Sequence, residues 1–282
     1  MAHGPYDGTD CETGAIFADM SDLTDLIDLT QFGHRARFLI VTLPRSGSYH
    51  LASLLDSAPG VTCLGELFKR KVIELPPDLR RKVGLARGDT AIRDADPLGY
   101  LALLMAHCEA PVFGFKEFLD RIQVAGIGKY TLRSDDWQKI FLMRNPIRKY
   151  ISLQRAIQTG TYTKLQPGAL PEDNAVIRFD PVLFDGTIRQ DRKLRERYQQ
   201  LSERSPRHNM MLDYRDLNDP AALGRVLEFI AAEGDGAALS SGYFRQNSLP
   251  LRDSIADYDL MARHAAEHGL AAELDDADDP CA

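Results

Sequence analysis

The fold follows from one stretch of the chain, RFLIVTLPRSGSYHLASLL, at residues 37–55. Its first part is apolar on both faces, which predicts a buried strand over Arg37 to Leu43. The turn PRSGS follows at once, and the leucines of YHLASLL then recur at helical spacing. Gly47 permits the turn, and the backbone N–H groups at the start of the helix converge where an anion would bind. This arrangement indicates a phosphate-binding loop, although PRSGS alone is equally compatible with a plain β-to-α turn.

Other short apolar runs alternate with helical patterns along the rest of the chain. The runs are Val61 to Leu64, Pro111 to Phe115, Lys139 to Met143 and Asn209 to Asp213. Runs that are apolar on both faces favour buried parallel strands, and the amphipathic segments between them favour crossover helices. We therefore predict an α/β fold of the P-loop-like type, with three α/β/α layers around a central, mostly parallel sheet.

Composition limits the partners and the location. The 282 residues carry a formal net charge of −7, with a pI of about 5.5, so neither nucleic acid nor a membrane is an expected partner. Four scattered cysteines predict reduced thiols and no metal site.

The first thirty residues contain seven acidic side chains and no Lys or Arg, unlike a signal peptide, which predicts a cytoplasmic protein. We expect an acidic N-terminal extension over residues 1–31, one domain over 32–269 and an acidic tail over 270–282.

A second helix start follows the run that ends at Met143. Arg144 comes next, Asn145 is a typical N-cap residue and Pro146 occupies the first helical position. Arg144 and Ser152, two turns into the helix, could reach one anion, so we assign both to a second phosphate site. For this helix we expect a buried stripe of Ile147, Tyr150, Ile151 and Ile157 and a solvated face with Arg148, Lys149 and Arg155.

The chain carries PRSGS, RNPIRKYIS and MLDYRDL, in this order. Together these motifs resemble the sulfotransferase family, whose donor is 3′-phosphoadenosine 5′-phosphosulfate (PAPS), and the similarity covers roughly Arg37 to Asp259. The resemblance implies that the first loop holds the 5′-phosphosulfate and that Arg144 and Ser152 hold the 3′-phosphate. The implied loop ligands are Arg45, Ser46, Gly47, Ser48 and Tyr49.

Two further motifs, SLQRAIQTGTY at 152–162 and YFRQNSLPLRDSIADYDL at 243–260, narrow the resemblance. They are similar to the bacterial carbohydrate sulfotransferases of the trehalose and nodulation-factor type. That branch implies Arg245 and Gln246 as further ligands of the nucleotide, although both would also suit an exposed polar loop before a last helix. It implies a hydroxyl acceptor on a sugar or glycoconjugate, and it leaves a homodimer open.

Sulfuryl transfer to a hydroxyl needs a base for the acceptor proton and positive charge at the departing phosphate. Glu66, in LGELF, stands 21 residues after Arg45, the spacing of the glutamate base in the resembling branch. Lys116, which ends PVFGFK, resembles the family's strand lysine. The alternatives are a helix-capping role for Glu66 and a solvated Lys116. We predict Glu66, Arg45 and Lys116 as catalytic residues, with no metal.

Other functions stay open at this point. The GxxxxGK[ST] pattern of a Walker A loop is absent, which argues against a P-loop kinase or another phosphoryl transferase. The remaining alternatives are a sulfotransferase for a non-sugar small molecule and a non-catalytic nucleotide-binding protein. The basic stretch from Lys69 to Arg93 would either contact an anionic acceptor or form a solvated excursion.

Overall fold

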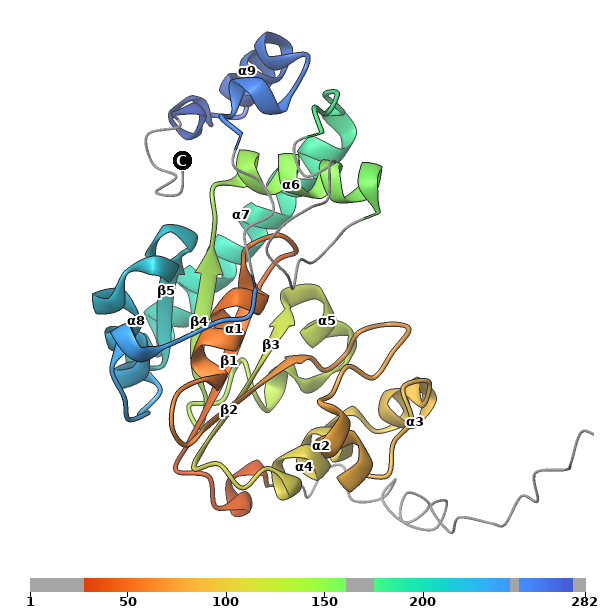
Figure 1. Ribbon diagram of the computed structural model, residues 1–282, viewed down its shortest axis with the longest axis vertical. Coiled ribbons are helices and arrows are strands. Elements are labelled where there is room, and N and C mark those ends of the chain that lie inside the picture. Colours follow the sequence, from red (N-terminus) through yellow and green to blue (C-terminus); the bar gives the residue numbers. More distant parts are fainter. Residues whose placement is uncertain (1–27, 161–174, 244–248, 276–282) are drawn as a thin grey trace, which may run out of the picture.

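The computed structural model describes residues 28–160, 175–243 and 249–275. Its centre is a five-stranded sheet (Figure 1) of β1 (Ala36–Thr42), β2 (Val61–Glu66), β3 (Val112–Phe118), β4 (Gln138–Met143) and β5 (Asn209–Asp213). The strand order is β2-β3-β1-β4-β5, and each pair of neighbours runs parallel. The predicted parallel sheet is confirmed.

Helices cover both faces of the sheet (Figure 1). They are α1 (Ser48–Asp56), α2 (Pro77–Lys82), α3 (Thr90–Ala95), α4 (Pro97–His107), α5 (Leu119–Val124), α6 (Pro146–Thr159), α7 (Pro181–Arg204), α8 (Pro220–Phe229) and α9 (Tyr258–Glu267). From β1, Phe38 and Ile40 enter a core shared with α1 and α8. Leu39 and Val41 enter the opposite core, which α4, α5 and part of α7 complete. Because successive strand residues face opposite sides, both helical layers bury β1, and the predicted three-layer fold is confirmed.

A third core lies beyond the carboxyl end of β4, where α6, the start of α7 and α9 pack together. Its buried side chains include Ile147, Tyr150, Phe184 and Met261. This core forms the upper part of the molecule in Figure 1. Short 3-10 helices lie at Leu29–Phe32, Ile127–Lys129, Pro206–His208, Tyr214–Asn218, Gly236–Ala238, Arg252–Ser254 and Ala271–Leu274.

Some predictions fall outside the described residues. These are Arg245 and Gln246, residues 1–27 of the expected N-terminal extension and residues 276–282 of the expected tail. The division of the chain into three parts therefore stays a prediction. Within the described ranges, no helix is both long enough and apolar enough to span a bilayer.

The exposed face of α6 differs from the prediction. Ile157, expected in the buried stripe, is 53% exposed, whereas the cationic side chains expected in water are buried. Lys149 forms an ion pair with Asp191 of α7. Arg148 donates to the carbonyl of Leu249 at 3.0 Å, and Arg155 donates to the carbonyl of Ala175 at 2.8 Å. The expectation was wrong because α7 and the segments around residues 175 and 249 cover the charged side of α6 and supply partners for its cations.

The basic stretch from Lys69 to Arg93 contains α2 and α3. Arg93 is only 1% exposed, and it donates to the backbone carbonyls of Leu67 at 3.3 Å and Lys69 at 2.8 Å. It therefore fastens α3 to the segment that follows β2. Neither of the two predicted roles, acceptor contact or solvation, describes Arg93.

Candidate active site

The PRSGS turn joins the end of β1 to the start of α1. Arg45 and Gly47 both adopt left-handed backbone angles, with φ of 68° and 79°. A Cβ atom at Gly47 would lie 2.6 Å from the ring of Tyr214, so the turn needs glycine there. No side chain caps α1, which leaves its first N–H groups for an anion. The Ser46 hydroxyl is buried and has no hydrogen-bond partner in the described part of the chain, so this turn fits a phosphate group.

The two predicted anion sites are in direct contact. Arg45 Nε donates to Ser152 Oγ at 2.9 Å, and Arg144 Nη1 donates to the carbonyl oxygen of Arg45 at 2.9 Å. The Arg144 guanidinium also lies 4.1 Å from the centroid of the Tyr214 ring. Because Tyr214 also borders Gly47, one aromatic ring supports both sites. A single ligand with two phosphate groups could therefore contact the β1 turn and α6 at once.

Glu66 and Lys116 meet at the edge of the sheet through an irregularity in β2. The register between β2 and β3 shifts between Leu64 and Glu66, so that Glu66 is opposite Lys116 where regular pairing would place Gly65. Such a bulge redirects a side chain. Lys116 Nζ donates to Glu66 Oε1 at 2.5 Å, and Arg121 of α5 donates to Oε2. The two predicted catalytic residues are thus brought together, with Arg121 as an additional partner.

Burial and ion pairing shift the pKa values of Glu66 and Lys116 in opposite directions. Glu66 is 4% exposed and Lys116 is 0% exposed. Burial favours a higher pKa for Glu66, but the positive charges of Lys116 and Arg121 outweigh it and hold the pKa below its usual value. For Lys116, burial is the largest influence and lowers the pKa, although Glu66 opposes that shift. Glu66 is therefore a carboxylate at neutral pH, the form that can accept a proton.

Tyr49, in the first turn of α1, connects the phosphate loop to this cluster. Lys116 Nζ lies 3.7 Å from the centroid of the Tyr49 ring, a cation–π contact. The Tyr49 hydroxyl donates to Glu74 Oε2 at 2.8 Å. Burial, reinforced by the charges of Glu66 and Glu74, raises the pKa of Tyr49, so the phenol stays neutral. The backbone of Tyr49 belongs to the loop, while its ring lies against Lys116.

Glu117, the residue after Lys116, accepts hydrogen bonds from the backbone. Its carboxylate accepts the N–H of Phe68 at 2.8 Å and the N–H of Phe118 at 2.9 Å. Burial raises the pKa of Glu117 to about 7. Glu117 thereby fastens the segment that follows Glu66 to β3, and its two backbone hydrogen bonds account for its burial.

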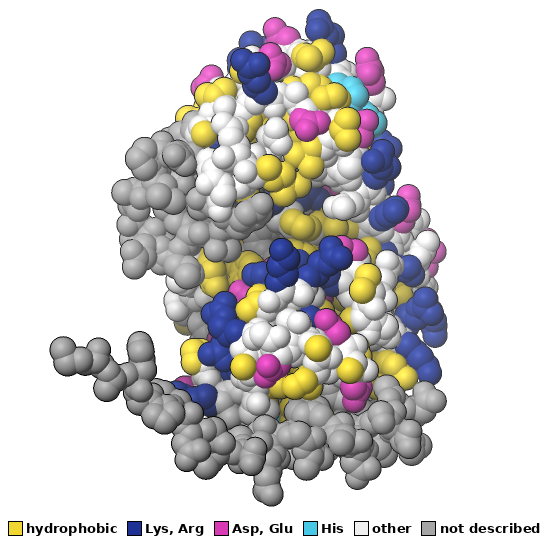
Figure 2. Space-filling view, turned by 90° about the vertical axis from the view of Figure 1, so that its right-hand side faces the viewer, with side chains coloured by type: hydrophobic (Ala, Val, Ile, Leu, Met, Phe, Trp, Pro, Cys, Tyr) yellow, Lys and Arg dark blue, Asp and Glu magenta, His cyan; other side chains and the backbone are white. Residues whose placement is uncertain are grey.

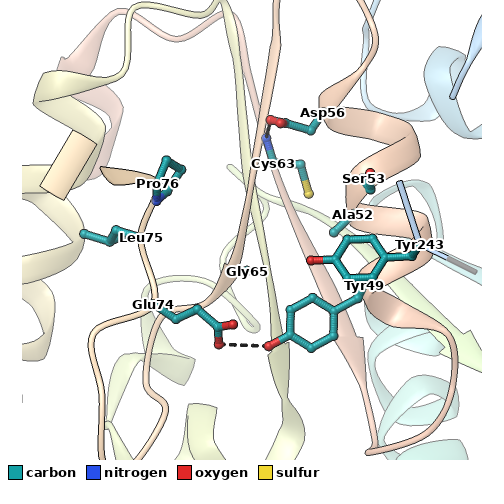
Figure 3. Close-up of a pocket in the computed structure, with 10 residues that line it drawn as sticks. All are labelled: Tyr49, Ala52, Ser53, Asp56, Cys63, Gly65, Glu74, Leu75, Pro76 and Tyr243. Carbon is teal, nitrogen blue, oxygen red and sulfur yellow. Dashed lines mark hydrogen bonds between the residues drawn. The ribbon is translucent and has the colours of Figure 1, made fainter. Parts of the chain in front are cut away.

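A cavity of about 290 Å³ lies between α1 and residues 74–76, beside β2 (Figure 3). The rings of Tyr49 and Tyr243 border it, with their centroids 5.5 Å apart. Two carboxylates, those of Asp56 and Glu74, also line it. Figure 3 shows the hydrogen bond from Tyr49 to Glu74 across one end of this space. Gly65, the neighbour of Glu66, also lines the cavity, so the cavity lies next to the cluster of Glu66, Lys116 and Arg121.

Sequence reasoning missed Arg121, Tyr214 and Tyr243. The spacing of Arg121 four residues after Glu117 is typical of an ion pair on a helix face and gives no reason to expect a contact with Glu66. Tyr214 lies within the MLDYRDL motif, but the motif does not reveal which ring packs against Gly47. Tyr243 begins the motif YFRQNSLPLRDSIADYDL, but the motif does not reveal that its ring borders the cavity beside Tyr49.

The chain is similar to a known protein in sequence and to several solved structures in overall arrangement. No family model matches the chain. The chain is similar to nodulation protein H from Rhizobium tropici, with 26% identity over 253 residues, covering 86% of this chain and 95% of that protein. It is also similar to the solved structure of a sulfotransferase domain from the curacin biosynthetic pathway, with 12% identity and a TM-score of 0.49, covering 84% of this chain and 90% of that one.

Sulfotransferase STF9 from Mycobacterium avium is similar at 14% identity and a TM-score of 0.48, covering 91% of this chain and 80% of that one. These TM-scores are below 0.5, and the fold rests on the sheet itself. The match to nodulation protein H extends over most of both proteins, and the motifs PRSGS and RNPIRKYIS assemble at one site. Both findings support the PAPS-dependent sulfotransferase family that the sequence predicts for this chain.

Proposed function

We propose that the protein transfers a sulfuryl group from PAPS to a hydroxyl group of a carbohydrate or glycoconjugate. The observation that carries the proposal is the contact of Arg45 with both Ser152 and Arg144, because it joins two anion sites into one. The buried hydroxyl of Ser46, which lacks a partner among the described residues, supports a bound phosphate at the loop. The similarity to nodulation protein H supports a sugar acceptor.

Each side of the nucleotide has its own ligands in this proposal. Arg45 and the backbone N–H groups of Ser46, Gly47, Ser48 and Tyr49 bind the 5′-phosphosulfate. Arg144 and Ser152 bind the 3′-phosphate. Arg245 and Gln246 remain proposed as further ligands on the basis of the resemblance.

Bound PAPS would supply the sulfuryl group. Glu66 accepts the proton of the acceptor hydroxyl as the hydroxyl oxygen forms its bond to sulfur. Lys116, which donates to Oε1 of Glu66 in this structure, transfers its hydrogen bond to the phosphate oxygen that keeps the electron pair when its bond to sulfur breaks, and this frees Oε1 for the proton; Arg45 neutralises the same phosphate. Arg121 stays on the second oxygen of Glu66 and holds the carboxylate in position. Because a sulfuryl group carries less charge than a phosphoryl group, these cations replace the metal that a kinase needs.

We place the acceptor in the cavity beside β2. The faces of Tyr49 and Tyr243 suit the apolar faces of a sugar ring, and the carboxylates of Asp56 and Glu74 can accept hydrogen bonds from its hydroxyls. Lys69 pairs with Glu74 at 2.9 Å, so one of the two negative charges is balanced, and the other, on Asp56, disfavours an anionic acceptor. An uncharged sugar is therefore the acceptor that this lining fits best.

The test is a calorimetric titration with adenosine 3′,5′-bisphosphate (PAP), AMP and ATP, followed by transfer of labelled sulfate from PAPS to uncharged glycans. PAP should bind about 10- to 100-fold more tightly than AMP, because the 3′-phosphate adds charge-assisted hydrogen bonds. Arg189→Ala, at an exposed position of α7, is the control that should keep this preference. Metal-dependent ATP turnover would favour a kinase. Tight PAP binding without transfer to any acceptor would favour a nucleotide sensor.

A further inference from the structure

Asp185, His264 and His268 form a cluster far along the chain from the residues of the candidate active site. Asp185 lies in the second turn of α7, His264 lies in α9, and His268 caps the end of α9. His264 Nε2 is 2.7 Å from Asp185 Oδ1, and His268 Nε2 is 3.0 Å from the same oxygen. One ligand atom from each of the three residues lies within 4.8 Å of the other two.

The helix and its neighbours hold the two imidazole rings in place. A spacing of four residues puts His264 and His268 on the same face of α9. Their ring centroids are 4.9 Å apart, and both rings pack against Phe184. The carboxylate of Glu267 lies 3.8 Å from His264 Nδ1, the ring nitrogen that faces away from Asp185. In metal sites a carboxylate that accepts a hydrogen bond from this nitrogen fixes the tautomer of the ligating ring; at 3.8 Å Glu267 makes no hydrogen bond here, but its side chain is 75% exposed and can approach.

We propose that Asp185, His264 and His268 bind one zinc ion or a similar divalent transition metal ion. Two imidazole nitrogens and one carboxylate oxygen are the donors that such ions prefer, whereas magnesium and calcium prefer oxygen alone. In tetrahedral zinc sites ligand atoms lie roughly 3.4 Å apart, so the cluster has to open by about half an ångström. The side chains of His264, His268 and Asp185 are 23%, 27% and 33% exposed, respectively, so they can move. Water can take the fourth position on the ion.

The bound ion would link α9 to α7 at the surface of the third core. Figure 2 shows histidine side chains at the surface in the upper part of the molecule, where Figure 1 places α9. Met261 and Ala265, on the same helix, are buried in that core, so the metal would reinforce an existing contact. The role is structural and independent of the proposed sulfuryl transfer.

The test uses untagged full-length protein that has been treated with EDTA and dialysed. Calorimetric titration with zinc chloride should show saturable binding of one ion per chain. At zinc about 100-fold above its Kd, the Tm should rise on the order of 5 °C. Cobalt(II) at the same site should give visible absorption bands that zinc abolishes, and magnesium should leave the Tm unchanged.

Two variants and a control separate this site from other histidines. Asp185→Asn keeps an oxygen that can accept hydrogen bonds from both rings, so the fold is retained, but it removes the anionic ligand. Asp185→Asn and His268→Ala should both lose the zinc-dependent rise in Tm, whereas His107→Ala, on α4, should keep it. Wild-type zinc binding and Tm shift in both variants would overturn the proposal, as would the absence of saturable binding by the wild-type protein.

Discussion

Replacing Lys116 by Met tests the environment of Glu66, because methionine keeps an unbranched stem and removes the charge. The Lys116 and Glu66 side chains are 0% and 5% exposed, so water does not screen their interaction. Removing one partner of a buried ion pair costs about 3–5 kcal/mol of unfolding free energy. Because Arg121 remains paired with Glu66, we expect the lower end, about 3 kcal/mol. For a chain of this size that is a fall in Tm of about 6–12 °C.

The pH dependence separates the effect of charge from that of packing. The pKa of Glu66 is lowered in the folded wild type, so its stabilising contribution is present above the usual pKa of 4.5 and is lost as the pH falls through the folded value. In Lys116→Met the Glu66 carboxylate stays buried but loses the positive charge of Lys116, so its pKa rises. Protonation then removes the buried negative charge and its cost in stability. The stability difference between the two proteins should therefore shrink as the pH falls from 7.5 to 5.

The assay is urea unfolding followed by circular dichroism at both pH values. The double variant Glu66→Gln/Lys116→Met should recover most of the loss, because it leaves no unpaired buried charge. Lys129→Met, at an exposed position, is the control and should change stability by less than about 0.5 kcal/mol. The reasoning fails if Lys116→Met is as stable as wild type at pH 7.5, or if the double variant is no more stable than the single one.

Substitutions at four positions test the remaining parts of the site. Glu66→Gln should lower kcat about 10²- to 10⁴-fold and leave PAP affinity unchanged, since it removes only the base; wild-type turnover would exclude that role. Arg144→Ala should cost about 1.5–3 kcal/mol of PAP binding by calorimetry, with a smaller loss for AMP, and equal losses would place Arg144 elsewhere. Gly47→Ala should lower the Tm and weaken PAP binding, because its Cβ would meet Tyr214 at 2.6 Å; unchanged affinity would contradict the loop's role. Tyr243→Ala should raise the KM for the acceptor without changing PAP affinity, while Tyr243→Phe should behave as wild type.

The sequence predicts most of the sheet because its strands are buried on both faces. The run Asn209–Asp213 is the observed β5, and the predicted first strand differs from β1 by one residue at each end. β3 extends to Phe118, beyond the predicted end at Phe115, because Lys116 and Glu117 are buried with partners that a hydropathy pattern cannot reveal. The order of strands in the sheet depends on long-range pairing and could not be derived from local patterns.

The contact between predicted site residues could be anticipated where those residues directly follow strands. Arg45 and Arg144 follow β1 and β4, which are neighbours in the sheet, so their contact is a consequence of the topology. The side chains of α6 were harder to place, because helical periodicity cannot reveal that Asp191 of α7 would pair with Lys149. Contacts between distant segments decide which charged residues are buried, and they leave no local signal.

The bulge in β2 lies at the edge of the sheet, away from the strand that precedes the PRSGS turn. β1 has neighbours on both sides, so the turn that follows it is anchored by two ladders. β2 pairs only with β3, so an extra residue there disturbs one ladder and leaves the rest of the sheet regular. The proposed donor loop thus follows a central strand, whereas the proposed base lies on an edge strand whose pairing accommodates an extra residue. Of the cavity lining, Cys63 and Gly65 belong to β2, so we expect substitutions at these two positions to change the proposed acceptor site with less effect on the proposed donor loop than substitutions in α1, which borders both.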